Sequence, residues 1–451
     1  MSRQIRLLFG ISVFWLALSV LFDGVNTLVL PLQLSNLAGQ SNQATVLGLL
    51  TFIGLLAGAL AQPIAGAFSD RLQTRLGRKG FIGVGLILSL ASLFLLASFQ
   101  TFLGVMVGYL AVQISASIAQ AGQQGLIPDL VEKQRRGLAS GLKGFMDLTG
   151  AMLGFVILGQ ILGSGGVVPA IRAIAVMIVI AYVLAVLLTP EDRPDRTAAI
   201  TKKVPTLRRI FRFDLVQSST FIRLIVSRFL FLLGIYGTGR FLLFFVADRL
   251  GLTEAQAAEQ AGNLLAGLAF ITIVASPLTG WLTDRIGRIP LMLSGAVLST
   301  LSALMLVWAS SASQILLFGG LMSLGSAAFA SGSWALMADL VPGDEPARFF
   351  GLANFSTAGA AAAAGLFGPV IDAVERIFPG MGFSVLFILA SIAFLTSALP
   401  LKQVRSMKEE KHEDKTKIRS NASGLAVVSL PADSALLEED DQDSQGRTAR
   451  L

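Results

Sequence analysis

Apolar stretches of about 20 residues, separated by short polar segments, recur along the chain as far as residue 400. An α-helix of about 20 mostly apolar residues spans the hydrocarbon core of a bilayer, so each stretch predicts one membrane helix. The predicted helices cover residues 7–33, 42–68, 80–98, 101–125, 138–163, 169–189, 220–247, 256–282, 290–309, 313–338, 346–372 and 380–400. The pattern therefore predicts an all-α membrane protein with twelve transmembrane helices.

The composition supports this prediction and excludes several kinds of chemistry. Hydrophobic residues fill 54% of the 451 positions and charged residues 14%, whereas soluble domains carry about 25% charged residues. The chain has no cysteine, and its one histidine, His412, lies in a charged tail, so thiol nucleophiles, zinc sites and catalytic triads are not expected. It also lacks the phosphate-binding pattern G-x-x-x-x-G-K-S/T. We therefore expect no enzyme, no cofactor, no metal site and no ATP-driven pump.

Lysine and arginine are distributed unevenly between alternate loops. The basic residues of one set of loops include Arg3, Arg6, Arg71, Arg75, Arg78, Lys79, Lys133, Arg135, Arg136, Lys143, Arg285, Arg288 and Arg348. The opposite set holds Arg172, Arg249 and Arg376. Because cytoplasmic loops carry the excess of basic residues, both termini are predicted to be cytoplasmic in a multi-pass protein of the cell membrane. Spread over many loops, these residues form no patch for nucleic acid.

The long polar segment in the middle of the chain divides it into two sets of six helices. We expect an N-terminal bundle at 1–189, a cytoplasmic central loop at 190–218, a C-terminal bundle at 219–400 and a disordered cytoplasmic tail at 401–451. The basic central loop either lies on anionic lipid headgroups or simply tethers the two halves. The first apolar stretch is too long for a signal peptide and has no cleavage site, so we expect it to stay as a membrane helix. The protein is expected to be a monomer.

Two segments of the chain match each other in sequence. Residues 63–71 read PIAGAFSDR and residues 277–285 read PLTGWLTDR, with Pro, Gly, Asp and Arg at the same spacing. Further matches follow in the same order: Gly-Arg at 77–78 and 287–288, and Asp-Leu-Val at 129–131 and 339–341. Matched landmarks in a constant order indicate a duplicated unit of six helices.

The second copy completes the pattern G-x-x-x-D-R-x-G-R from Gly280 to Arg288, which resembles the signature of the major facilitator superfamily. The resemblance covers the membrane part of the chain and implies two pseudo-symmetric six-helix bundles that transport by alternating access. It implies that the loop residues act as conformational latches, through charge-assisted hydrogen bonds and tight glycine turns. These residues are Gly66, Asp70, Arg71, Gly77, Arg78, Gly280, Asp284, Arg285, Gly287 and Arg288. The alternative is that they only anchor the topology and turn the chain.

A few polar side chains fall deep inside the predicted membrane helices, where ionisable groups are costly and mark functional sites. Asp23 and Asn26 share a face of the first helix, and Tyr236 and Arg240, spaced i, i+4, share a face of the seventh. The repeat places Asp23 and Arg240 at similar depth. Further candidates for substrate binding are Gln113, Gln120 and Gln124 in the fourth helix and Trp334 in the tenth. The alternative is that these groups join neighbouring helices by hydrogen bonds, or that Asp23 and Arg240 form a structural ion pair.

These features predict a secondary active transporter of a small polar solute, working as a symporter with H⁺ or Na⁺. Asp23 would be the proton-linked carboxylate. The longer first-half loop from Asp70 to Lys79 resembles that of sucrose and other glycoside carriers of the superfamily, which favours a sugar or glycoside. The fifth helix lacks the Gly-Pro element of the drug and proton antiporters, which lowers the expectation of drug efflux. A drug or metabolite efflux carrier remains an alternative, as does a non-transporting membrane assembly factor or sensor.

Overall fold

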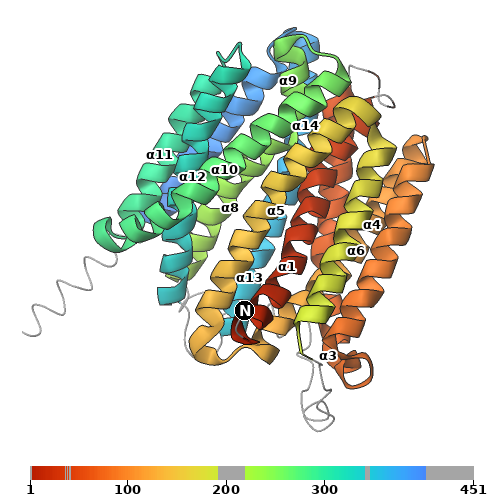
Figure 1. Cartoon of the computed structure of the whole chain (residues 1–451). Coiled ribbons are helices and arrows are strands. Elements are labelled where there is room, and N and C mark those ends of the chain that lie inside the picture. Colours follow the sequence, from red (N-terminus) through yellow and green to blue (C-terminus); the bar gives the residue numbers. More distant parts are fainter. Residues whose placement is uncertain are drawn as a thin grey trace, which may run out of the picture. The chain divides into compact units, whose positions relative to one another are not determined.

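The structure is a computed structural model that describes residues 3–35, 37, 39, 42–190, 219–340 and 346–402. Most of the predicted central loop and of the predicted tail lies outside the described residues. The helices of the first half are α1 (Arg3–Gly24), η1 (Val25–Val29), α2 (Leu30–Ser35), α3 (Gln43–Ser98), α4 (Phe102–Leu130), η3 (Lys133–Arg135), α5 (Arg136–Gly165) and α6 (Val167–Leu188). Figure 1 shows the long helices α1, α4, α5 and α6 running side by side.

The helices of the second half follow the same plan. They are α8 (Ser219–Arg240), α9 (Leu242–Leu250), α10 (Glu254–Ile286), α11 (Arg288–Leu306), α12 (Ala312–Leu340), α13 (Pro346–Ala363), η4 (Ala364–Leu366) and α14 (Phe367–Ile377). A last helix covers Gly382–Lys402. Within the described residues, twelve helical segments are long and apolar enough to cross a membrane. Each coincides with a predicted span, so the predicted fold class is confirmed.

Two glycines reverse the chain at matching points of the two halves. α3 contains two membrane spans, Gln43–Ser69 and Gly77–Ser98, and its backbone leaves the helical conformation at Gly77, where φ is 67°. Gly287, between α10 and α11, has φ of 95°. Residues with a Cβ atom rarely adopt a positive φ, so a glycine is needed in both Gly-Arg pairs of the repeat.

The seventh span differs from its prediction. A single helix was expected at 220–247, but α8 ends at Arg240 and a separate short helix, α9, starts after Phe241. Gly237 and Gly239 lie in the last turn of α8, and glycine lowers helix stability by about 1 kcal/mol relative to alanine. Gly237 also packs directly on the ring of Phe367, since a Cβ atom there would lie 2.5 Å from the ring. The break leaves Arg240 at the end of its helix.

The first helix is also irregular, next to the predicted site. Residues Val25–Val29 form a π-helical turn between α1 and α2. A π turn holds one extra residue and often occurs at functional sites, because it changes the direction of the side chains around it. Here it contains Asn26 and begins two residues after Asp23.

Glycines of α5 and α10 let the two halves pack closely together. A Cβ atom on Gly159 would lie 3.0 Å from the Cα atom of Gly262, and one on Gly262 would lie 2.5 Å from the backbone oxygen of Phe155. The two helices lie next to each other in Figure 1. Small residues permit such close helix packing inside a membrane.

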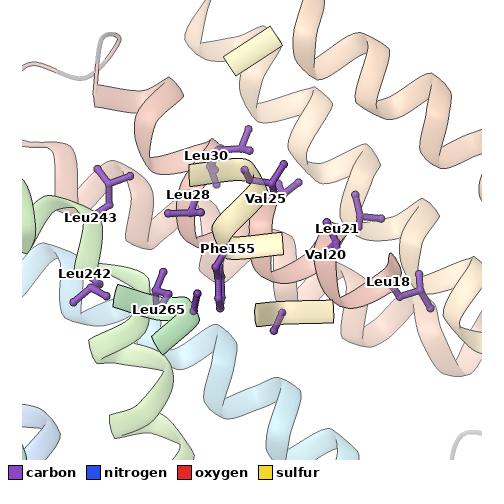
Figure 2. Close-up of a cluster of buried hydrophobic side chains, with 14 of the residues drawn as sticks. Leu18, Val20, Leu21, Val25, Leu28, Leu30, Phe155, Leu242, Leu243 and Leu265 are labelled. Carbon is purple, nitrogen blue, oxygen red and sulfur yellow. The ribbon is translucent and has the colours of Figure 1, made fainter. Parts of the chain in front are cut away.

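Buried apolar side chains fill the space around this crossing. Figure 2 shows Leu28 and Phe155 from the first half near Leu242, Leu243 and Leu265 from the second. Each of these side chains is at most 8% exposed. The halves thus share one hydrophobic core at this level.

A second contact between the halves joins the start of α3 to the segment from η4 to α14. A Cβ atom on Gly48 would lie 2.0 Å from the backbone oxygen of Gly365, and one on Gly368 would lie 2.0 Å from that of Ala44. The buried carboxylate of Asp372 accepts a hydrogen bond of 2.6 Å from the backbone N–H of Thr45. We call the pairs Gly159–Gly262, Gly48–Gly365 and Ala44–Gly368 the gate contacts.

The gate contacts all lie at the end of the bundle opposite the N-terminus, because Gly159 is near the end of its span and Ala44 and Gly48 are near the start of theirs. Glycines toward the N-terminal end behave differently. A Cβ atom on Gly66, Gly141 or Gly280 would meet no atom within 4 Å. Among the described glycines, close packing between the halves is thus confined to one end.

Candidate functional site

The predicted pair Asp23 and Asn26 lies inside the bundle and is held by side chains of α1 and α4. Ser19, one turn earlier, donates a hydrogen bond of 2.7 Å from its Oγ to Oδ2 of Asp23. Oδ1 of Asn26 accepts hydrogen bonds from the Tyr109 hydroxyl, at 2.7 Å, and from Nε2 of Gln113, at 2.8 Å. These bonds fix the amide of Asn26, so that its Nδ2 donors are the part left for another partner.

Arg240 comes to the same place from the second half. Its side chain is 6% exposed, and Nη2 donates a hydrogen bond of 3.1 Å to the backbone oxygen of Ala361. The side chains of Tyr109 and Tyr236 interact with it electrostatically, and Tyr109 also interacts with it as a hydrogen-bonding group. Tyr236 in turn interacts with Asp23 as well as with Arg240. The tyrosines therefore connect the acid of the first half to the base of the second.

Arg228 is a further buried charge of the site, and the sequence analysis missed it. It lies three turns before Arg240 on α8 and is 6% exposed. Nη1 donates a hydrogen bond of 2.8 Å to Oγ of Ser333, and the guanidinium lies 4.4 Å from the ring centre of Trp334. A cation over an aromatic face is attracted by the ring. An arginine inside an apolar stretch was a sufficient signal to find it.

The first half contributes a second set of charges. The Lys143 ammonium lies 3.7 Å from the ring centre of Trp15. Asp147, one turn after Lys143, interacts electrostatically with Lys143 and with Asp23. The acids of the site thus come from the first half, and its arginines come from the second.

Most of the predicted substrate-binding residues lie in this cluster: Asp23, Asn26, Gln113, Tyr236, Arg240 and, through Arg228, Trp334. Tyr109 also belongs to it, and its position four residues before Gln113, on the same helix face, could have predicted this. Gln120 accepts a hydrogen bond of 3.1 Å from Nε2 of Gln62, which joins α3 to α4. Gln124 lies one turn further along α4. The role of all these residues in binding substrate stays a prediction.

The loop motifs form matching ion pairs in the two halves. Nε of Arg78 lies 2.9 Å from Oδ2 of Asp129, and Nη1 donates a hydrogen bond of 2.9 Å to Oγ of Ser69. Arg288 pairs with Asp339. The Asp-Leu-Val echo of the sequence repeat therefore supplies the partners of the two arginines.

Other predicted latch residues make no contact between the halves that the structure describes. Arg285 lies over the ring of Trp281, 4.6 Å from its centre, and Asp284 is exposed. The side chains of Asp70 and Arg71 lie outside the described part. Both ion pairs join helices within one half, α3 to α4 and α11 to α12. A latch between the halves stays a prediction.

Twelve membrane spans, two matching halves and a buried polar cluster to which both halves contribute define a membrane transport protein. The comparison with known families agrees with this class. The model described as the Major Facilitator Superfamily matches residues 8–258 and 224–436, and the chain belongs to this family. The resemblance seen in the loop motifs is thereby confirmed.

Two similar proteins carry names that refer to drug resistance. The multi-drug resistance efflux pump PmrA of Streptococcus pneumoniae is 24% identical over 327 residues, which cover 71% of this chain and 78% of the pump. The quinolone resistance protein NorA of Staphylococcus aureus is 27% identical over 227 residues, which cover 50% of this chain and 55% of NorA. A solved structure of the peptide transporter POT superposes with a TM-score of 0.68 at 14% identity, covering 89% of this chain and 94% of POT, which shows the shared fold.

Proposed function

We propose that this transporter is an efflux carrier for drugs or metabolites, which was the alternative to a sugar carrier in the sequence analysis. The observation that carries the proposal is the similarity to PmrA and NorA, together with a site lined by both charges and aromatic rings. Tryptophan and tyrosine rings beside charged groups suit amphipathic solutes, which have both an apolar part and a polar part. The preference for a sugar finds no support among these relatives and stays a prediction.

The mechanism is alternating access between the two halves. In this structure the gate contacts close the end opposite the N-terminus, and among the described glycines the close packing does not extend to the N-terminal end. By the distribution of basic residues, the N-terminal end faces the cytoplasm. The structure then corresponds to a state that takes up solute from the cytoplasm. Rocking of the two halves about the polar cluster breaks the gate contacts and releases the solute on the other side.

Export against a gradient needs coupling to an ion, and Asp23 is the residue proposed for it. It is a carboxyl group inside the membrane, hydrogen-bonded to Ser19, and linked electrostatically to Tyr236 of the other half. A proton on Asp23 changes the charge that the first half presents to the second. Protonation and the rocking of the halves are thereby connected in one place.

The test is transport in everted membrane vesicles, which expose the cytoplasmic face, with a proton gradient imposed. We expect uptake of a quinolone or of the cationic dye ethidium by vesicles that contain the chain, and loss of gradient-driven uptake in Asp23→Asn. Asp248→Asn, at an exposed carboxylate outside the membrane spans, is the matched control and should transport normally. If a folded protein moves no drug or metabolite of a broad panel, the proposal is wrong and a non-transporting membrane protein is favoured.

A further inference from the structure

Arg240 carries a buried charge whose hydrogen-bonding needs are largely unmet. Nη2 bonds to the backbone oxygen of Ala361, but Nε and Nη1 have no acceptor within the described part of the chain. Nε carries one N–H donor and Nη1 carries two. Both atoms are enclosed by protein in this structure, so bulk water does not supply the missing bonds, and a solute group reaches them only when the packing around Arg240 opens. An uncompensated charge of this kind is among the most destabilising features that a buried site can hold.

No carboxylate of the described residues neutralises it. The ion pairs found there join Arg78 to Asp129, Arg135 to Glu132 and Arg288 to Asp339, so neither Arg240 nor Arg228 belongs to one. Arg228 also has a buried Nε without an acceptor among the described residues, but its two other nitrogens bond to Ser333 and Thr357 and its guanidinium lies over the ring of Trp334. Arg240 is therefore the position at which the site lacks an anion.

Across the cluster the charge has the opposite sign. Asp23 and Asp147 belong to the first half, with Lys143 one turn before Asp147, and Tyr236 interacts electrostatically with Asp23 and with both arginines. A solute with several negative charges would be repelled by these acids. A solute with one negative group, and a neutral or cationic remainder, fits both sides.

We propose that the substrates of this site carry a carboxylate that binds Arg240, with the neutral or cationic part of the solute directed toward Asp23. This inference rests on the proposed function and specifies its substrate class. The planar guanidinium matches the two oxygens of a carboxylate, and Tyr109, which interacts with Arg240, also bonds to Asn26. The bound solute supplies the counter-charge that the empty protein lacks.

The test compares solutes that differ only at the carboxylate. The probes are a quinolone-3-carboxylate with its methyl ester, phenylalanine with its amide, and ethidium as a solute without a carboxylate. Binding to the purified protein is measured by quenching of tryptophan fluorescence, since Trp15 and Trp334 contact charged residues of the site. The variants are Arg240→Gln, which removes the charge, and Arg240→Lys, which keeps it but loses the planar fork.

We expect each carboxylate to bind at least about ten-fold more tightly than its ester or amide. The ratio of these two affinities should fall to near one in Arg240→Gln and to an intermediate value in Arg240→Lys. The empty Arg240→Gln protein should melt at the same temperature as the wild type or higher, because the unmatched charge is gone. An arginine with only a structural role would give a lower melting temperature and no change in the ratio.

Two results would overturn the inference, and they differ in what they say about the proposed function. If ethidium and the esters bind as tightly as the carboxylates, the substrate class is wrong but the efflux carrier stands. If a cooperatively melting protein binds none of the probes, the substrate class and the proposed function both fail.

Discussion

Replacing Gly48 by alanine places a methyl group in one of the closest contacts between the two halves. The new Cβ atom would lie 2.0 Å from the backbone oxygen of Gly365, whereas an ordinary van der Waals contact begins at 3.4 Å. The obstacle is backbone rather than a flexible side chain, so the helices must separate by more than 1 Å. Overpacking of this kind costs about 1–3 kcal/mol. Because the cost falls on the gate-closed state, the equilibrium should shift toward the gate-open state by about 5- to 150-fold.

The natural absence of cysteine provides the assay. Ala258 lies in the gate beside Gly159 and is 0% exposed, and Ala258→Cys gives the protein its only thiol. In lipid nanodiscs, the rate at which a water-soluble maleimide labels this thiol reports how often the gate opens. We expect faster labelling when Gly48→Ala is added.

The matched control is Gly144→Ala, because a Cβ atom there meets no atom within 4 Å. Both substitutions favour the helical state by about 1 kcal/mol, and this term is equal in the open and closed states. Gly144→Ala should therefore leave the labelling rate unchanged. Equal labelling rates for Gly48→Ala and Gly144→Ala, in proteins that remain folded and monodisperse, would refute the assignment of the gate contacts.

Two further predictions concern charged residues near the ends of the helices. Truncating Arg78 to alanine should lower the melting temperature more than truncating Arg288, because Arg78 is buried and bonds to both Asp129 and Ser69. Double-mutant cycles should give a coupling energy of about 1.5–3 kcal/mol for Arg78 with Asp129. The coupling energy of the more exposed pair of Arg288 with Asp339 should be below about 1 kcal/mol. The pKa of Asp248 is raised, mainly because its carboxyl group is partly removed from water and secondly because the charge of Glu375 is nearby; the charge of Arg249 lowers the pKa and offsets part of the shift. Ionisation of Asp248 therefore destabilises the folded state as the pH rises from the ordinary pKa of aspartate, about 3.9, through the raised pKa of Asp248. Asp248→Asn should raise the melting temperature at pH 7 but not at pH 3. An equal effect at both pH values would contradict this.

The membrane spans and the duplication could be predicted from the sequence because both depend on local information. A span needs about 20 apolar residues in a row, and the twelve predicted positions coincide with helices of the structure. The Gly-Arg pairs marked the two reversals, since a positive φ requires glycine at Gly77 and Gly287. The break at Phe241 was missed because two glycines in one turn weaken a helix without fixing where it ends.

The candidate site was predictable in part. Helix periodicity placed Asp23 with Asn26 and Tyr236 with Arg240, and the rarity of ionisable groups inside a membrane made them candidates. The same rule should have included Arg228. Periodicity identifies the face of a helix, but it does not identify what that face meets. Gln120, for example, was predicted from its position in the fourth helix, and only the structure shows that it accepts a hydrogen bond from Gln62; its role in binding substrate stays a prediction.

By itself, the sequence determined the class of the protein: a duplicated set of twelve membrane helices, few buried charges and two related loop motifs. Tertiary structure alone decided which of these residues meet. Tyr109 bonds to Asn26 across 83 positions of the chain, and Arg228 bonds to Ser333 across 105. Whether a buried arginine has a carboxylate partner depends on distances of a few ångströms between helices that are far apart in sequence. Arg240, whose charge meets no acid among the described residues, could be recognised as the place for an anion only after the helices were packed together.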